Sequence, residues 1–334
     1  MYLGSLWEYR SGVRLFVGLL SLLPLAPAHL GSGDSVQPRN TESVIEKIAP
    51  AVPDGVKIEI VGADTFVRLT AVGVRAEVRG YDDEPYLRIS AEGLVEVNES
   101  SVTAVLNGDR YGNVDTSKMK PNNVPKWRTI ATNGIAMWHD HRSHWMSPLL
   151  PATIDDKGTV LNWDIPMIIA GQRTLVSGSL YLRDQASAAW WLLVIPALAI
   201  AVLLSLLRRR AFFALVVGAS LLGAVTGVLE FTGLPKGAQI TPVMLMFCAG
   251  ALTIAIAAAI RLIRPGAMHI AVSLNAGAGA ALVVCAWLTA DQVRAAYIPG
   301  IDALWLARTA IPVMMGVGLV AVIDGVTRII RTAP

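Results

Sequence analysis

Three of the five histidines in the chain lie within six residues, in the stretch Trp-His-Asp-His-Arg-Ser-His-Trp-Met. Imidazole is a common metal ligand and transfers protons near neutral pH, so this stretch is the densest chemical signal in the sequence. If residues 129–141 form one strand, His139 and His141 project from the same face, about 7 Å apart along the backbone. A turn near Ser143 is then needed to bring His144 beside them.

Five side chains are candidate metal ligands. Three imidazoles with a water suit zinc, whereas imidazole together with a methionine sulfur favours copper. Cleavage of a leader peptide after Ala28 makes His29 the mature N-terminus, where its α-amine and ring nitrogen form a chelating pair. The candidate ligands are His29, His139, His141, His144 and Met146. The expected ion is copper, with zinc as the alternative.

A metal-free interpretation of the same stretch stays open. Histidine and tryptophan side chains in one strand also build a hydrogen-bonded sheet rim, with Asp140 and Arg142 paired on a solvated face. The acidic run Asp82-Asp83-Glu84 lacks the spacing of an EF-hand loop and predicts a solvated turn. The chain contains no nucleotide-loop, nucleophile-elbow or zinc-protease motif, so an enzyme is the less favoured class.

The composition indicates a membrane protein. Of 334 residues, 54% are hydrophobic and 16% are charged, whereas about 25% of a soluble domain is charged. The mean hydropathy is +0.52. Residues 188–334 hold 10 Lys and Arg against 4 Asp and Glu, and the rest of the chain holds 18 against 21. Because binding to nucleic acid needs a basic face, the acidic first part makes nucleic acid an unexpected partner.

The first 28 residues have the pattern of a secretion signal. Arg10 and Arg14 precede an apolar run over residues 15–25, which is too short to span a bilayer comfortably. A tripeptide of small residues and proline then ends at Ala28, which is the pattern read at cleavage sites. We therefore expect a signal peptide over residues 1–28.

Residues 29–185 predict an extracytoplasmic β domain. Short runs rich in β-branched and aromatic residues recur between turn residues, and several alternate between apolar and polar side chains. This pattern is typical of an antiparallel β-sandwich of the immunoglobulin-like (Ig-like) kind. The predicted strands cover residues 56–61, 65–72, 74–78, 86–89, 94–97, 102–106, 129–138, 159–163 and 175–182. Both cysteines of the chain lie outside this domain, so disulfides do not stabilise it.

Residues 186–334 predict a transmembrane bundle of five helices in a lipid bilayer. Each segment is long and apolar enough to cross a hydrocarbon layer about 30 Å thick. The segments cover residues 189–207, 211–229, 240–260, 270–289 and 307–323. Seven arginines fall on one side of them and three basic residues on the other, so the positive-inside rule predicts a cytoplasmic C-terminus. The β domain is then extracytoplasmic, in agreement with the predicted signal peptide.

Small residues predict close packing of these helices. Residues 275–281 read Asn-Ala-Gly-Ala-Gly-Ala-Ala, and Gly316 and Gly318 lie in the last segment. Glu230 and Arg308 fall near helix ends, where an interfacial place is favoured over an ion pair between them. Sulfur-containing side chains lie at Met244, Met246, Cys248, Met314 and Met315. Apolar packing is their favoured role, and binding of a soft metal is the minor alternative.

Three stretches of the predicted β domain resemble a known group of proteins. One begins at Gly80 (Gly-Tyr-Asp-Asp-Glu-Pro-Tyr-Leu-Arg-Ile), one at Leu106 (Leu-Asn-Gly-Asp-Arg-Tyr-Gly) and one at Trp138. With the signal and the C-terminal helices, they resemble uncharacterised actinobacterial membrane proteins. That resemblance implies a cell-surface or periplasm-like location and no particular activity. Through His29 and the sandwich pattern, the chain is also similar to copper-resistance C-type exported carriers, whose mature chain begins with a copper-binding histidine.

Three classes of function follow from these patterns. The first is an extracytoplasmic protein that holds copper or zinc on its β domain. The second is a metal-free interaction or assembly module for a cell-envelope partner. The third is a membrane enzyme or transporter, and it is favoured least because no ionisable residue falls in mid-membrane.

Overall fold

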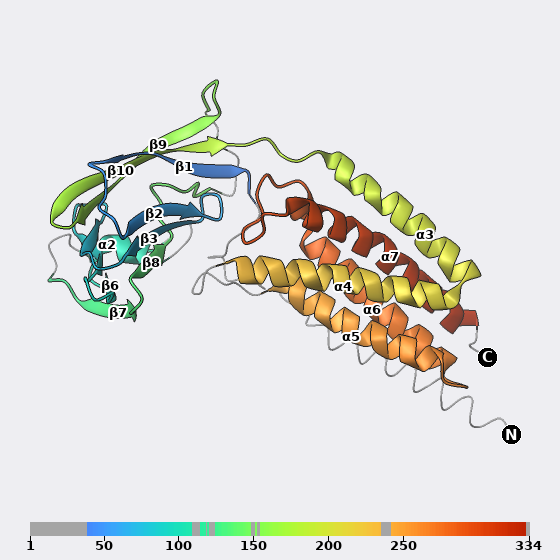
Figure 1. The fold of residues 1–334 in the computed structure, drawn as a ribbon. Helices are drawn as coiled ribbons and strands as arrows, with labels where there is room; N and C mark the ends of the chain where they lie inside the picture. Colours follow the sequence, from blue (N-terminus) through green and yellow to red (C-terminus); the bar gives the residue numbers. More distant parts are fainter. Residues whose placement is uncertain are drawn as a thin grey trace. The chain divides into compact units, whose positions relative to one another are not determined.

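The computed structural model describes residues 39–108, 114–117, 119, 124–147, 151, 154–234 and 242–331. They form two compact units, which divide between Asp184 and Gln185 (Figure 1). The first unit consists of strands with one short helix, and the second consists of long helices. The expected signal peptide and the candidate ligand His29 lie outside the described residues and stay predictions.

The described strands of the β unit form two antiparallel sheets. The larger sheet has the order β1-β10-β9-β4-β5-β6-β7, and the smaller has the order β2-β3-β8. The strands are β1 (Thr41–Ala49), β2 (Val56–Val61), β3 (Phe66–Ala71), β4 (Ala76–Arg79), β5 (Pro85–Ile89), β6 (Val95–Asn98), β7 (Trp127–Ala131), β8 (Ile135–Trp138), β9 (Thr159–Ile169) and β10 (Gln172–Leu182).

Both sheets contribute to one hydrophobic core. Val67, Leu69 and Ala71 of β3 are fully buried, every second residue as the pleat of a strand requires. Ile165 and Met167 of β9 enter the same core from the larger sheet. The prediction of an antiparallel β region is thus confirmed, and the Ig-like topology stays a prediction.

Two elements of the β unit differ from the sequence prediction. Strand β1 was not predicted, because its run of apolar residues is interrupted at Glu46-Lys47, where the pairing register also shifts. Residues 102–106 were predicted to form a strand but form the short helix α2 (Val102–Leu106). The Ser101 hydroxyl accepts a hydrogen bond from the backbone N–H of Ala104, 3.2 Å away, and this N-cap outweighs the β-branched composition.

The strand predicted over residues 129–138, and its possible extension to residue 141, is wrong in its extent. It splits into β7 and β8, which belong to different sheets, and β8 ends before His139. The chain changes sheets at Gly134, which has a φ of 71°. A Cβ atom at Gly134 would lie only 2.5 Å from the carbonyl oxygen of Ala71. Only glycine fits this close, left-handed turn.

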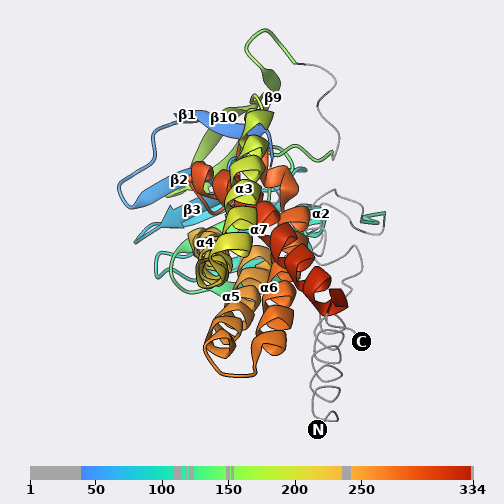
Figure 2. The same ribbon diagram turned by 90° about the vertical axis from the view of Figure 1, so that its right-hand side faces the viewer.

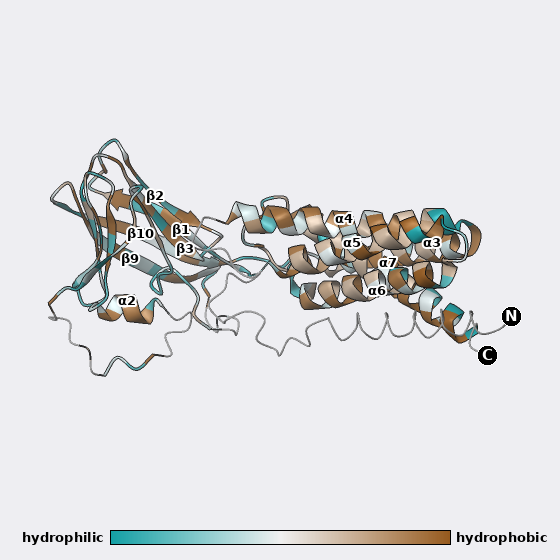
Figure 3. Ribbon diagram, turned by 90° about the horizontal axis from the view of Figure 1, so that it is seen from below, coloured by the Kyte–Doolittle hydropathy of each residue, from teal (hydrophilic) through white to brown (hydrophobic). Residues whose placement is uncertain are grey.

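Five helices of the described residues are long and apolar enough to cross a membrane. They are α3 (Val194–Leu207, preceded by the 3-10 turn η1, Ala188–Leu193), α4 (Arg209–Gly233), α5 (Val243–Leu262), α6 (Met268–Leu288) and α7 (Leu304–Arg331); η2 (Ala290–Val293) follows α6. Hydrophobic residues dominate along all five (Figure 3). The prediction of five long apolar helices is confirmed, and the chain is a membrane protein by the length and composition of these helices.

The small residues allow helix backbones to approach closely. Helix α6 packs against α5 on one side and α7 on the other (Figure 2). Where α6 and α7 meet, a Cβ atom at Gly279 would lie 2.6 Å from the Ala321 Cβ and 2.7 Å from the Gly318 oxygen. The expected close packing at residues 275–281 and Gly318 is therefore confirmed.

We predict that Gly279→Ala lowers the thermal stability of the full-length protein in detergent, whereas Gly277→Ala does not. The added methyl group at Gly279 forces α6 and α7 apart, and such overpacking costs about 1–3 kcal/mol. A Cβ atom at Gly277 meets nothing within 4 Å, so that variant is a matched control on the same helix. Equal melting temperatures for the two variants would contradict the close α6–α7 contact.

Candidate functional site

The three neighbouring histidines come together at the end of β8. A turn follows the strand, in which the backbone N–H of Ser143 donates to the Asp140 carbonyl over 3.1 Å. The turn brings the His144 ring to 4.1 Å from the His139 ring, measured between centroids. The His141 ring lies 5.3 Å from that of His139. The expected grouping is present, and the turn near Ser143 produces it rather than a continuous strand.

Hydrogen bonds orient the ring of His139. Its Nδ1 lies 2.8 Å from the backbone carbonyl oxygen of Thr65, just before β3. A carbonyl oxygen only accepts, so the proton of a neutral His139 is on Nδ1 and the lone pair is on Nε2. This is how the ring of a metal-binding histidine is commonly held by groups outside the coordination sphere.

Asp64 orients His144 in a similar way. The Nδ1 of His144 lies 3.2 Å from Asp64 Oδ2 and 3.3 Å from the Asp64 carbonyl oxygen, and 3.0 Å from Nη1 of Arg39. The Arg39 guanidinium only donates, so its contact requires a lone pair on Nδ1, whereas a contact with either Asp64 oxygen requires a proton there. The ring is thus held at Nδ1 by the buried ion pair of Arg39 and Asp64.

Asp64 is the centre of a buried polar cluster. It forms an ion pair with Arg39 and accepts hydrogen bonds from the Thr41 hydroxyl at 2.8 Å and the Trp145 backbone N–H at 3.2 Å. Asp64 and His144 are each 2% exposed. Burial alone would raise the pKa of Asp64, but Arg39 and His144 outweigh it and hold this pKa well below its usual value. The carboxylate therefore stays charged beneath the histidines.

Asp140 and Arg142 do not pair on a solvated face, as the metal-free interpretation had assumed. Asp140 is 1% exposed and accepts from the Trp138 ring N–H at 2.8 Å and from Arg142 Nε and Nη2 at 2.9 and 2.8 Å. The guanidinium also lies over the Tyr81 ring, 4.9 Å from its centroid. Burial raises the pKa of Asp140, and the bonds from Arg142 lower it further than burial raises it. This second ion pair holds the histidine turn onto the β unit.

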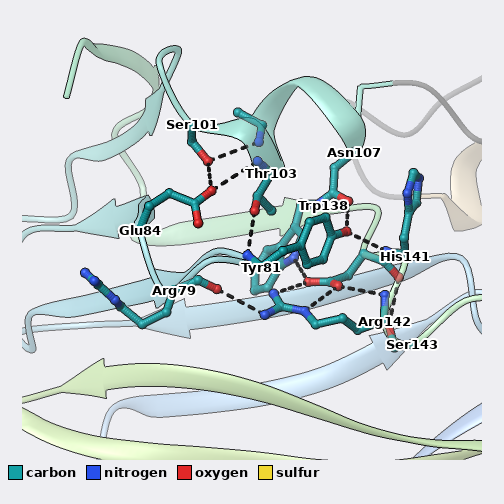
Figure 4. A network of polar contacts seen from close by, with 12 residues as sticks. Arg79, Tyr81, Glu84, Ser101, Thr103, Asn107, Trp138, His141, Arg142 and Ser143 are labelled. Atoms are coloured by element: carbon teal, nitrogen blue, oxygen red, sulfur yellow. Dashed lines mark hydrogen bonds and ion pairs between the residues drawn. The ribbon is translucent and has the colours of Figure 1, made fainter. Parts of the chain in front are cut away.

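Tyr81 links the histidine turn to helix α2 (Figure 4). Its hydroxyl oxygen accepts from the His141 backbone N–H at 3.1 Å and also bonds to the Asn107 side chain. Its own backbone N–H donates to the Thr103 hydroxyl at 2.7 Å. Burial raises the pKa of the Tyr81 hydroxyl above its usual value, so this group stays a neutral donor and acceptor.

The acidic turn is solvated only in part. Asp82 and Asp83 are exposed, but Glu84 is 5% exposed, so the prediction of a wholly solvated turn is wrong. The Glu84 carboxylate accepts from the Ser101 hydroxyl at 2.6 Å and from the Thr103 backbone N–H at 3.1 Å, at the start of α2 (Figure 4). Glu84 is thus a structural cap for that helix.

Met146 is the remaining candidate ligand among the described residues. Its side chain is half-buried, two residues beyond His144. Among the residues that the structure describes, no three His, Cys, Asp or Glu side chains already stand in a metal-binding arrangement.

Sequence reasoning missed Arg39 and Asp64, since nothing in their local sequence indicates that they meet residues some 80 to 105 positions away.

Glu230 and Arg308 of the helical unit do not form an ion pair with each other in the described residues. Arg308 Nη2 donates to the Ala295 carbonyl oxygen over 2.8 Å, and the Glu230 carboxyl group hydrogen-bonds the Gln292 side chain. The alternative of a Glu230–Arg308 pair is therefore wrong, because η2 and the residues after it supply a partner to each.

We predict that Glu84→Gln lowers the unfolding free energy of the β unit by about 1–3 kcal/mol at pH 7, because charge-assisted bonds to α2 are lost. Burial raises the pKa of Glu84, but the bonds from Ser101 and Thr103 outweigh it and lower that pKa overall. A carboxyl group whose pKa is lowered on folding stabilises the protein above its unfolded pKa, about 4.3. The difference between wild type and variant should therefore shrink as the pH falls below about 4.

Hydrogen exchange of peptides from the β unit, in the full-length protein, measures this difference at each pH. The matched control is Asp82→Asn, which removes an exposed carboxylate two residues away and should change exchange little. A pH-independent effect of Glu84→Gln would show that the charge of Glu84 is not what stabilises α2.

Comparison with known proteins leaves the site to be interpreted from its own geometry. No protein family, no curated protein and no solved structure matches the chain.

Proposed function

We propose that the chain is an integral membrane protein whose β unit lies outside the cytoplasm and binds a divalent transition-metal ion, copper or zinc. His139 and His144 are the first two ligands and His141 is the third. One observation carries the proposal. The imidazole rings of His139 and His144 lie 4.1 Å apart between centroids, and contacts at Nδ1 with Thr65 and with the Arg39–Asp64 pair hold both rings in place.

The third ligand has to move before the ion is bound in full. The His141 ring already packs against His139, and its side chain is half-buried. We propose that a change of its side-chain rotamer turns a ring nitrogen toward the pair. Met146 and a mature N-terminal His29 are proposed as further ligands that would favour copper over zinc. The carboxylates of Asp64 and Asp140 are not proposed as ligands, because each is ion-paired to an arginine.

The distribution of arginines supports the proposed orientation. Arg208 lies between α3 and α4, and Arg209 and Arg210 begin α4. Arg261 and Arg264 lie near the end of α5, and Arg328 and Arg331 lie near the end of α7. All seven fall at one end of the alternating helices, which the positive-inside rule places in the cytoplasm. The β unit, which precedes α3, is then on the opposite side of the bilayer.

A metal-free assembly module is the second candidate function. The favouring observation is that the two carboxylates nearest the histidines are already satisfied, Asp64 by Arg39 and Asp140 by Arg142. Such a cluster is stable without an ion and would present a rigid surface to a cell-envelope partner. This candidate predicts that metal ions leave the stability of the β unit unchanged.

We predict that the full-length protein in detergent binds one Cu(II) or Zn(II) ion, and that His139→Ala and His144→Ala each abolish this binding. The ion should also slow hydrogen exchange in the β unit, because a ligand that binds only the folded state stabilises it. Isothermal titration with each ion measures the stoichiometry. His269→Ala is the control, since His269 is exposed on α6. Unchanged binding in the His139 and His144 variants, or no binding by the wild type, would favour the metal-free module.

We predict that protease added to intact cells cleaves the β unit and spares a tag placed after Arg331. The bilayer shields cytoplasmic segments from the protease, so only the extracytoplasmic side is cut. Immunoblotting against a tag in the β unit and against the C-terminal tag gives the result, and lysed cells show that both are cleavable. Loss of the C-terminal tag with a protected β unit would reverse the orientation.

A further inference from the structure

Three sulfur atoms from three different helices meet in the core of the helical unit. The Sγ of Cys248 in α5 lies 3.7 Å from the Sγ of Cys285 in α6 and 3.3 Å from the Sδ of Met314 in α7. None of the three side chains has exposed surface. Cys285 was not among the sulfur residues considered from the sequence, whereas Met246, which was, is 59% exposed and stands apart from the cluster.

Helix α4 contributes space to this cluster. A Cβ atom at Gly223 would lie 2.4 Å from both the Cys248 Sγ and the Met314 Sδ. Any larger residue would displace the two sulfur atoms, so the glycine lets α4 pack directly over them. Four of the five helices thus converge on one small volume whose polar atoms are sulfur.

The two sulfur–sulfur distances from Cys248 are somewhat shorter than those between sulfur ligands of a bound metal ion. With metal–sulfur bonds of about 2.3 Å, sulfur ligands in trigonal or tetrahedral sites lie about 3.8–4.0 Å apart. The observed 3.7 and 3.3 Å are shorter, so uptake of an ion requires the two cysteine sulfurs to move apart by about 0.1–0.3 Å, and the Cys248 and Met314 sulfurs by about 0.5–0.7 Å.

The chemistry of the donors selects the ion. Thiolate and thioether sulfur favour Cu(I), whereas zinc sites usually add imidazole, carboxylate or further thiolates. In the described residues no histidine or carboxylate joins the two cysteines in a three-membered metal group. Two cysteines and one methionine therefore form a soft, three-coordinate donor set.

The carboxylate of Glu230 lies nearer to one end of the helical unit than the sulfur cluster does. Glu230 is seven residues after Gly223 on α4, two helical turns or about 10 Å along the axis and on the same face. Its Oε1 is buried and has no hydrogen-bond partner among the described residues. The Thr289 hydroxyl, which bonds to the Cys285 carbonyl oxygen at 2.8 Å, lies at the corresponding end of α6.

We propose that Cys248, Cys285 and Met314 form a Cu(I) site inside the membrane-spanning bundle, distinct from the histidine cluster of the β unit. Each cysteine that coordinates the ion as a thiolate releases one proton, and Met314 binds through its neutral thioether. Copper stays in the Cu(I) state, so no electron is transferred. The site goes beyond the proposed function and does not depend on it, since no residue is shared.

The test is anaerobic titration of the full-length protein in detergent with Cu(I), in competition with a chromophoric Cu(I) chelator. We expect one ion per chain in this site, loss of binding in Cys248→Ser and Cys285→Ser, and weakened binding in Met314→Leu. X-ray absorption of the loaded wild type should show sulfur neighbours only, at about 2.3 Å. This second measurement needs no variant, so it holds even where a substitution prevents folding.

Two controls separate this site from others. Met246→Leu alters an exposed methionine of the same helix and should leave Cu(I) binding intact. A variant with both His139 and His144 changed to Ala should keep the sulfur-coordinated ion, so failure of the histidine site and of this site are distinguishable. In the variant with His139 and His144 changed to Ala, the proposal is overturned by nitrogen or oxygen neighbours in the absorption spectrum, or by Cu(I) binding that survives Cys248→Ser. Protein from native membranes in which Cys248 and Cys285 form a disulfide would also overturn it.

Discussion

The buried ion pair between Arg39 and Asp64 is the contact on which the histidine cluster depends. Asp64 precedes β3, Arg39 precedes β1, and the same carboxylate contacts the His144 ring and the Trp145 backbone. Removing one partner of a buried pair typically costs about 3–5 kcal/mol, because the other charge is left uncompensated. The position of the imidazoles is therefore coupled to the folding of the whole β unit.

Some of this arrangement follows from local sequence, and some does not. A long apolar segment in a bilayer satisfies its backbone hydrogen bonds by forming a helix, so the five long apolar helices were predictable from the sequence. Grouping of His139, His141 and His144 followed from their spacing. Helix α2 was misjudged because its cap is built partly by Glu84, which is distant in the chain. The partners Arg39, Asp64 and Tyr81 were out of reach for the same reason, since no local pattern reveals which polar residues a fold will bury together.

The two units offer donor atoms of different chemical softness. Nitrogen donors gather in the β unit, where carboxylates and arginines surround them. Sulfur donors gather between helices whose other buried side chains are small and apolar. Borderline divalent ions and the monovalent copper ion prefer these two environments respectively. A protein with both sets could hold one element in two oxidation states, without either site competing for the other's ion.

The change of sheet at Gly134 has a mechanical consequence. Strands β7 and β8 are joined by only three residues, yet one belongs to the seven-stranded sheet and the other to the three-stranded sheet. The histidines follow directly after β8. His139 bonds to Thr65, just before β3 of the smaller sheet, and His141 bonds to Tyr81, between β4 and β5 of the larger sheet. A ligand that binds these imidazoles is therefore linked to both sheets. Relative movement of the two sheets would weaken binding of such a ligand, and a bound ligand would restrict that movement.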